Sequence, residues 1–190
     1  MDKIKINNNS VEIKVYEEYA EDSDNKQQYR YLLTKEWDTA NKIATVVMYN
    51  PSEATCLMYD KTVMNVENYL KRKNFNKIII LNLFAIKGKK SSIVVKRNEE
   101  FEKENINYIK SYIEDAEEVY LAWGYGKSNG PDYVKEKILE VERIVRDSKK
   151  NNLNSVRAFA DEDEVNVKCH PQNMNIETWT DIKYDFSHLE

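Results

Sequence analysis

The chain has 190 residues, of which 41% are apolar and 33% charged, and its net charge at pH 7 is −4. This length suits one domain that buries roughly two thirds of its unfolded surface. We find no stretch near the roughly 18 apolar residues of a membrane span and no signal peptide. The negative charge is unlike that of a protein that coats duplex nucleic acid by charge alone.

The two cysteines, Cys56 and Cys169, have neither the spacing of a zinc site nor that of a disulfide framework. We therefore expect both to be small buried side chains of a cytoplasmic protein. The sequence predicts no metal and no cofactor.

Two extended segments begin the chain. Residues 11–19 alternate apolar and charged side chains, and residues 29–33 continue as a second extended run. The two segments predict a β-hairpin. We expect a single domain over residues 1–190, with this hairpin as an appended extension (1–36), an α/β core (37–172) and a polar tail (173–190) in which Trp179 is the anchor.

Four short apolar runs are typical of buried strands, and they span residues 42–49, 77–81, 118–122 and 155–160. Amphipathic patterns separate them and predict helices that begin near Asp60, Asn98 and Pro131. Strands that alternate with helices favour parallel pairing with right-handed crossovers. The prediction is a three-layer α/β/α sandwich with a mainly parallel, four-stranded central sheet.

The residues that follow these strands indicate one site. All four glycines of the chain, and two of its three prolines, come shortly after the apolar runs. In an open parallel sheet, ligands bind in the crevice outside the carboxyl ends of the strands, because the connecting loops meet there. We therefore expect one pocket lined by four loops.

Three polar side chains in these loops suit catalysis or recognition. Asn50, in Asn50-Pro51-Ser52, can position water or a polar group but cannot act as a general base. Asp60 can hold a metal ion or orient water, and Asn82 can pair with the edge of a nucleobase. Each has a structural alternative: a turn for Asn50, a helix cap for Asp60 and a loop tie for Asn82.

Basic, aromatic and imidazole groups complete the candidate set. A cluster of Lys87, Lys89, Lys90, Lys96 and Arg97 suits phosphate contacts, or is merely a solvated surface. Trp123-Gly124 suits stacking on a base, although Trp123 can equally be a core residue. His170 can donate a hydrogen bond to an anion, and its alternative is a structural histidine.

The order of these motifs resembles a known family. Arg30, Trp37, Asn50-Pro51-Ser52, Asp60-x-Thr62, Asn82-Leu83-Phe84-Ala85, Trp123-Gly124 and His170-Pro171 are similar to domain-of-unknown-function family 1643, found in bacteria and phages. This resemblance implies no settled activity. More distantly, Asn50, Asn82, Ala122-Trp123-Gly124 and His170-Pro171 resemble the uracil-DNA glycosylase superfamily, which implies that superfamily's three-layer α/β fold.

The distant resemblance implies roles for single residues. Asn82 would read a base, Asn50 would hold water beneath the sugar, and His170 would stabilise the departing base. Apart from the resemblance, the carboxylate of Asp60 makes it a further catalytic candidate. The substrate-binding candidates are Ser52, Tyr59, Asn82, Phe84, Trp123 and Gly124, and the phosphate-binding candidates are Lys87, Lys89, Lys90 and Arg97. Two departures from the pattern are Met48-Tyr49 before the first motif and Gln172 after the last.

Three functions remain open. The first is hydrolysis of an N-glycosidic bond in a nucleoside, nucleotide or single-stranded nucleic acid. The second is a non-catalytic module that binds a nucleobase, a nucleotide or nucleic acid at the same pocket. The third is a protein-interaction domain that presents the edge of its amino-terminal hairpin.

Overall fold

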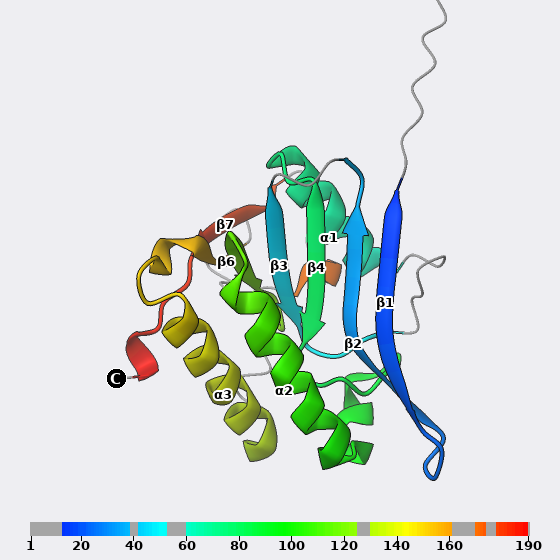
Figure 1. The fold of residues 1–190 in the computed structure, drawn as a ribbon. Helices are drawn as coiled ribbons and strands as arrows, with labels where there is room; N and C mark the ends of the chain where they lie inside the picture. The colour runs from blue at the N-terminus through cyan, green and yellow to red at the C-terminus, as the bar shows by residue number, and fades with distance from the viewer. Residues whose placement is uncertain are drawn as a thin grey trace, which may run out of the picture.

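The computed structural model describes residues 13–38, 42–52, 60–124, 130–160, 170–173 and 178–189. Over these residues the chain forms one sheet of seven strands, in the order β1-β2-β4-β3-β5-β6-β7, with three α-helices packed against it (Figure 1). The class is α/β, but the sheet is larger than the sequence suggests.

The prediction of a mainly parallel, four-stranded sheet is wrong, because strands from both ends of the chain extend it. At one side β1 (Lys14–Asp22) pairs antiparallel with β2 (Gln27–Glu36), which pairs antiparallel with β4 (Lys77–Asn82). At the other side β7 (Thr180–Lys183) pairs antiparallel with β6 (Val156–Ala160). The sheet is therefore mixed.

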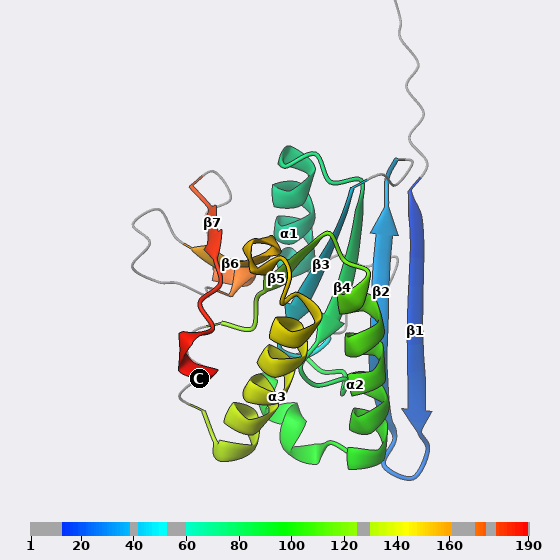
Figure 2. The ribbon, with the colours of Figure 1, turned by 60° about the vertical axis from the view of Figure 1, so that its left-hand side comes forward.

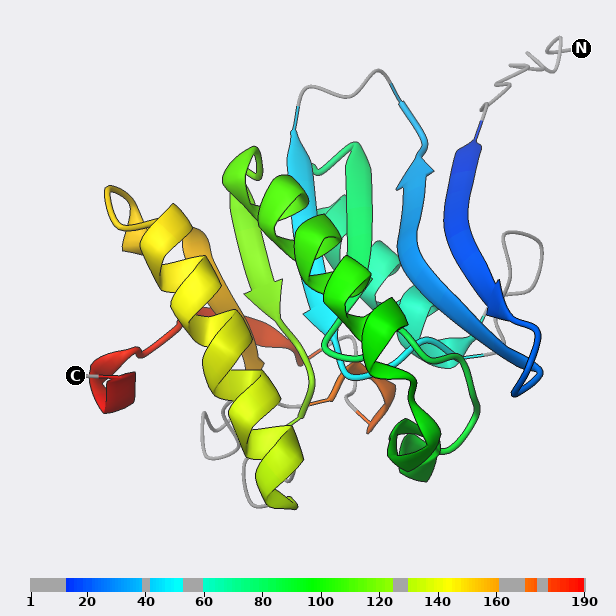
Figure 3. The ribbon, with the colours of Figure 1, turned by 60° about the horizontal axis from the view of Figure 1, so that its bottom comes forward.

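Parallel pairing occupies the middle of the sheet. There β3 (Ile43–Met48) lies between β4 and β5 (Glu118–Leu121) and pairs parallel with both, and β5 pairs parallel with β6. Nearly every residue of β3 and β4 is buried, as expected of strands covered on both faces. The carboxyl ends of these strands meet at one edge, which faces the viewer in Figure 3.

The helices begin close to where the capping pattern predicts, and they are α1 (Lys61–Arg72), α2 (Glu99–Glu114) and α3 (Asp132–Ser148). Asp60 accepts a hydrogen bond from the N–H of Val63 at 2.7 Å, and Asn98 accepts one from the N–H of Glu100 at 3.0 Å. Both contacts satisfy N–H groups that a helix leaves unpaired in its first turn.

Two hydrophobic cores lie on opposite faces of the sheet. Helix α1 covers one face, and α2 and α3 cover the other (Figure 2, Figure 3). On the α1 face, Val66 and Leu70 pack in one cluster with Ile78 and Ile80 of β4. The cluster on the other face contains Ile109 of α2 and side chains of α3. Alternate residues of each central strand therefore serve different cores.

The amino-terminal hairpin is not the appended extension that the sequence suggests. Leu32 and Leu33 of β2 are buried, one in each core. In addition, a buried ion pair joins Lys35 of β2 to Glu67 of α1, with the Nζ and Oε2 atoms 3.3 Å apart. Strand β2 is thus an interior strand, and of the two hairpin strands only β1 lies at an edge of the sheet.

The polar tail also belongs to the sheet, through β7. The ring of Trp179 packs against those of Tyr69 and Phe159, with centroids 5.6 and 5.2 Å away, so Trp179 is an anchor as expected. Over the described part of the chain, no helix combines the length and apolar character that crossing a membrane requires.

Candidate functional site

The loops that follow β3 and β4 are joined at the carboxyl edge of the sheet. The side-chain nitrogen of Asn50 donates hydrogen bonds to the carbonyl oxygens of Pro51 and Gly88, at 3.1 and 3.0 Å. The N–H of Gly88 donates in turn to the carbonyl of Pro51 at 2.9 Å. The Asn50 nitrogen therefore holds the two loops together, and only its side-chain oxygen is left for another group.

Asp60 and Ser52 form a second contact at this edge. Besides capping α1 through Oδ1, Asp60 accepts a hydrogen bond at Oδ2 from the hydroxyl of Ser52. Both oxygens of the Asp60 carboxylate are thus engaged. The structural role expected of Asp60 is present, and it also fixes the segment that leaves β3.

A buried cation, Arg30, lies on β2, the strand next to β4. The guanidinium of Arg30 is 2% exposed, and its Nη1 lies 3.4 Å from Oε1 of Glu17 on β1. Burial lowers the pKa of Arg30, while the carboxylates of Glu17 and Asp60 act in the opposite direction. Arg30 therefore brings a positive charge close to the amino end of α1.

Asn82 is the most unusual polar group at this edge. It is the last residue of β4 and is 2% exposed. Since Leu81 faces the core under α2 and α3, strand alternation directs Asn82 to the α1 face. Its side-chain nitrogen has no hydrogen-bond partner in the part of the chain that the structure describes. Buried amides are normally paired, so Asn82 is the candidate binding group of this edge.

His170 is packed against the end of β5. Gly124 has φ +93°, a left-handed conformation that favours glycine, and a Cβ placed there would lie 3.1 Å from the Cβ of His170. The carbonyl of Pro171, which begins η4 (Pro171–Asn173), accepts a hydrogen bond from the side chain of Asn65 on α1 at 3.0 Å. These contacts hold His170 between β5 and α1.

The protonation of His170 follows from its backbone contact. Its Nδ1 accepts a hydrogen bond from the N–H of Gln172 at 3.3 Å. A neutral imidazole that accepts at Nδ1 carries its proton on Nε2. The Nε2–H group is therefore a hydrogen-bond donor.

Two of the three aromatic substrate-binding candidates lie elsewhere. Phe84 and Trp123 are almost fully buried in the core under α2 and α3, where Trp123 contacts Tyr184 and Phe84 contacts Tyr49. Neither ring leaves a face for a base, so their role is structural. The third candidate, Tyr59, lies outside the described residues.

The predicted phosphate contacts divide into two groups. Lys87 is half-buried and Lys89 and Lys90 are exposed, on the loop that Asn50 holds. Arg97 instead covers the ring of Tyr133, at 4.7 Å from its centroid, and pairs with Glu99 at 2.8 Å. The lysines flank the carboxyl edge, whereas Arg97 packs on the α2 and α3 face.

Sequence reasoning missed two buried polar residues of α2 that shape this edge. Glu102 accepts hydrogen bonds from the N–H groups of Ala85 and Ile86, at 3.0 and 3.3 Å. Asn105 donates from its side chain to the carbonyl of Asn82 at 2.9 Å. Both occupy positions in register with the apolar residues of the helix, and a polar residue at such a position is the signal that could have revealed them.

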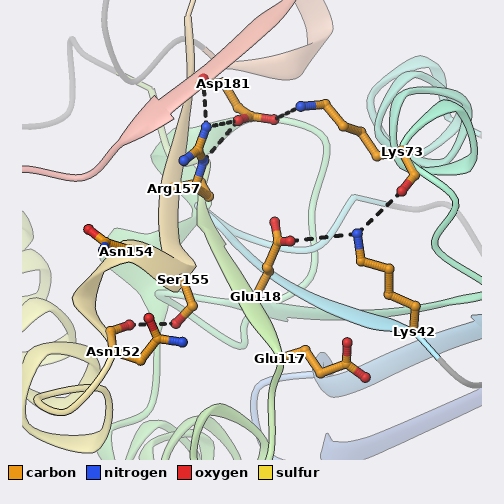
Figure 4. A pocket seen from close by; sticks show the side chains of 9 residues that line it. All are labelled: Lys42, Lys73, Glu117, Glu118, Asn152, Asn154, Ser155, Arg157 and Asp181. Carbon is orange, nitrogen blue, oxygen red and sulfur yellow. Dashed lines mark hydrogen bonds and ion pairs between the residues drawn. The ribbon is translucent and has the colours of Figure 1, made fainter.

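A cavity of about 530 Å³ lies at the opposite, amino edge of the sheet (Figure 4). Its charged groups other than Glu117 pair with one another: Asp181 binds Lys73 at 2.8 Å and also Arg157, and Lys42 lies 3.7 Å from Glu118. Such mutual pairing indicates a network that closes the edge of the sheet rather than a binding site. Over the described residues, no group of three His, Cys, Asp or Glu side chains could hold a metal ion.

Comparison with known proteins places the chain in a family. The family described as "Protein of unknown function (DUF1643)" matches residues 30–172, and the chain therefore belongs to this family. The match includes every candidate residue from Arg30 to His170 and leaves β1 outside. Neither a curated protein nor a solved structure is significantly similar to the chain.

Proposed function

We propose that the carboxyl edge of the sheet, on the face covered by α1, binds a nucleobase or a nucleotide. The observation that carries the proposal is the buried amide of Asn82, whose nitrogen has no partner among the described residues. A side-chain amide offers a donor and an acceptor side by side, which match the edge of a base. A ligand acceptor would also offset the free energy that an unpaired buried donor costs.

Positive charge on the loop that follows β4 favours a phosphorylated ligand. Lys87, Lys89 and Lys90 follow β4 on the loop that is bonded to Asn50 and Pro51. Their ammonium groups suit the phosphate of a nucleotide, or the backbone of a short single strand, because each neutralises a phosphate charge.

Binding without turnover is the function that these contacts support best. Hydrolysis at a sugar carbon needs a group that activates water, and an amide such as Asn50 cannot take a proton. The carboxylate of Asp60 already accepts hydrogen bonds from Val63 and Ser52. A module that holds a base and a phosphate therefore fits better than a hydrolase.

Hydrolysis of an N-glycosidic bond is the second candidate, and the distant resemblance to the uracil-DNA glycosylase superfamily suggests it. The observation that favours it is the Nε2–H donor of His170, fixed by the bond between its Nδ1 and Gln172. Such a donor would stabilise negative charge on a departing base, a contribution of roughly 3 kcal/mol in enzymes that use one.

Thermal unfolding in the presence of ligands tests the proposal. Wild type and Asn82→Ala are heated with nucleobases, nucleosides, nucleotides and short single-stranded oligonucleotides. A bound ligand at about 100 times its Kd adds roughly 2.7 kcal/mol, which raises Tm by about 5–10 °C for a domain of this size. We expect a nucleotide to raise the Tm of the wild type and to have a much smaller effect on Asn82→Ala.

The matched control is Thr45→Val, which removes a buried hydroxyl of β3 that donates to the carbonyl of Tyr112 at 3.5 Å. This variant should keep the full ligand shift. If no nucleic-acid component shifts the wild type, the proposal is wrong. Release of free base from a shifting nucleotide, lost in His170→Ala, would establish hydrolysis in place of binding alone.

A further inference from the structure

Exposed aromatic and apolar side chains gather on the edge strand β1. Tyr16 and Tyr19 are 55% and 60% exposed, and Ile13, just before the strand, is 45% exposed. Elsewhere in the described chain, only Met64 and Val95 are large apolar residues with comparable exposure. Isolated exposed side chains are ordinary, but a concentration of them on one strand indicates a contact surface.

The outer backbone of β1 is also unpaired within the described chain. Strand β1 ends the sheet, and in the described residues it pairs only with β2. Exposed edges are usually protected by prolines, lysines or bulges, because their free N–H and C=O groups accept another strand. Here the strand has no proline and a single lysine, Lys14, and the bulge in its pairing with β2 falls between Glu18 and Tyr19, where the extra residue is Tyr31 of β2. Residues 14–18 therefore form an open edge ahead of the bulge.

Negative charge dominates this edge. In addition to Lys14, β1 carries four carboxylates, those of Glu17, Glu18, Glu21 and Asp22. Glu17 is paired with Arg30. Glu18, Glu21 and Asp22 accept hydrogen bonds from neutral groups, and within the described residues none of the three has a cationic partner. The edge therefore attracts positive charge.

Tyrosine rings extend the surface across α2. Tyr108 of α2 stacks on Tyr31 of β2 and on Tyr112, with ring centroids 4.9 and 6.4 Å apart. The hydroxyls of Tyr108 and Tyr16 both donate to Glu18. Ring faces beside a carboxylate are favourable surroundings for a lysine or arginine side chain.

We propose that β1 accepts an extended, basic segment of a partner protein as an additional strand of the sheet. The segment pairs its backbone with residues 14–18, and its lysine or arginine side chains lie over Tyr16 and Glu18. Backbone pairing supplies affinity in this mode of recognition, and alternate side chains supply specificity.

A second copy of the chain is a poorer occupant of this edge. It would present the same excess of carboxylates, since an antiparallel pair over residues 14–18 brings four glutamates together with only two Lys14 side chains. Like charges on adjoining strands destabilise a strand pair. The charge of β1 therefore favours a basic partner over self-association.

The experiment uses synthetic peptides and the full chain. A nine-residue peptide that alternates lysine with valine is titrated into the protein, with binding followed by calorimetry and by hydrogen exchange of the β1 amides. One control peptide alternates glutamate with valine, and another is the lysine peptide with methylated backbone nitrogens along one edge. We expect only the unmethylated lysine peptide to bind, more weakly at higher salt.

Two matched variants locate the site. Tyr16→Lys and Met64→Lys each place a positive charge at an exposed apolar position, the first on β1 and the second on α1. We expect Tyr16→Lys to weaken binding about tenfold or more and Met64→Lys to leave it unchanged. No binding at millimolar peptide, or equal binding by both variants, overturns the proposal. A wild-type dimer that Tyr16→Lys dissociates would instead assign the edge to a second copy.

Discussion

The carboxylate of Glu102 on α2 holds the backbone N–H of Ala85, with its two oxygens at 3.0 and 3.1 Å. Ala85 lies three residues after Asn82, in the segment that turns away from β4. An acidic side chain in the core thus fixes the loop that begins at the proposed binding residue. Burial raises the pKa of Glu102 to about 7, although the bonds from Ala85 and Ile86 act against the rise.

The raised pKa predicts that stability falls as pH rises. Because the folded chain keeps a proton on Glu102 that the unfolded chain loses near pH 4.5, stability declines between about pH 4.5 and 7. The full effect is on the order of 3 kcal/mol. In Glu102→Gln the decline should disappear, since a neutral amide keeps an oxygen for Ala85. The pH dependence of stability is measured by urea unfolding from pH 5 to 8, with Glu104→Gln, at an exposed position, as control. Parallel pH curves for wild type and Glu102→Gln would contradict this prediction.

The ion network at the amino edge predicts the opposite pH dependence. Burial raises the pKa of Asp181, but hydrogen bonds from Lys73, Tyr69 and Arg157 outweigh it and leave the pKa below its ordinary value. The carboxylate therefore contributes stability above about pH 4, and this contribution is lost as pH falls through the folded pKa.

Asp181→Asn tests this network. Removing one partner of a buried pair costs about 3–5 kcal/mol, and we expect about 2 kcal/mol because Lys73 and Arg157 are partly exposed. Asp147→Asn, which breaks an exposed pair with Arg146, should cost less than about 0.5 kcal/mol. Urea unfolding at pH 7 compares the two. Equal losses of stability in the two variants would mean that Asp181 contributes no more than a surface charge. Below pH 4, where Asp181 itself becomes protonated, Asp181→Asn and the wild type should approach the same stability.

Local patterns sufficed for the helices and for the central strands, because their signals lie within each segment. Asp60 and Asn98 cap helices whose apolar spacing is regular, and the runs in β3, β4, β5 and β6 are almost entirely apolar. The outer strands carry no such signal. Strand β7 has the sequence TDIK, which has no apolar run. Its Asp181 pairs with Arg157 of β6, a contact between residues that are far apart in the chain.

The candidate site was predictable in outline only. The rule that loops meet at the carboxyl edge identified Asn50, Asp60, Asn82 and His170, which the structure places at that edge. The same rule could not tell on which face a residue lies, so Phe84 and Trp123 were assigned to the site although they pack in the core. Which face a strand-end residue occupies depends on the register of the whole sheet.

Gly124 links the sheet to His170, and its substitution tests that link. In Gly124→Ala the new Cβ meets the Cβ of His170 at 3.1 Å, and alanine is strained at φ +93°. We expect a loss of about 1–3 kcal/mol and a displaced His170. In Gly88→Ala the Cβ also approaches a neighbour at 3.1 Å, but that neighbour is the Ile93 side chain, so the loss should be smaller.

Nitrogen NMR of the imidazole rings separates displacement from a mere loss of stability. The chain has two histidines, so the signals of His170 are assigned by comparison with His188→Gln. In the wild type we expect a neutral ring with its proton on Nε2, because Nδ1 accepts from the N–H of Gln172. Displacement of His170 weakens that contact, so Gly124→Ala should show both tautomers whereas Gly88→Ala keeps the wild-type pattern. An unchanged tautomer in Gly124→Ala would show that Gly124 does not position the ring, and the donor role of Nε2–H would then depend on η4 alone.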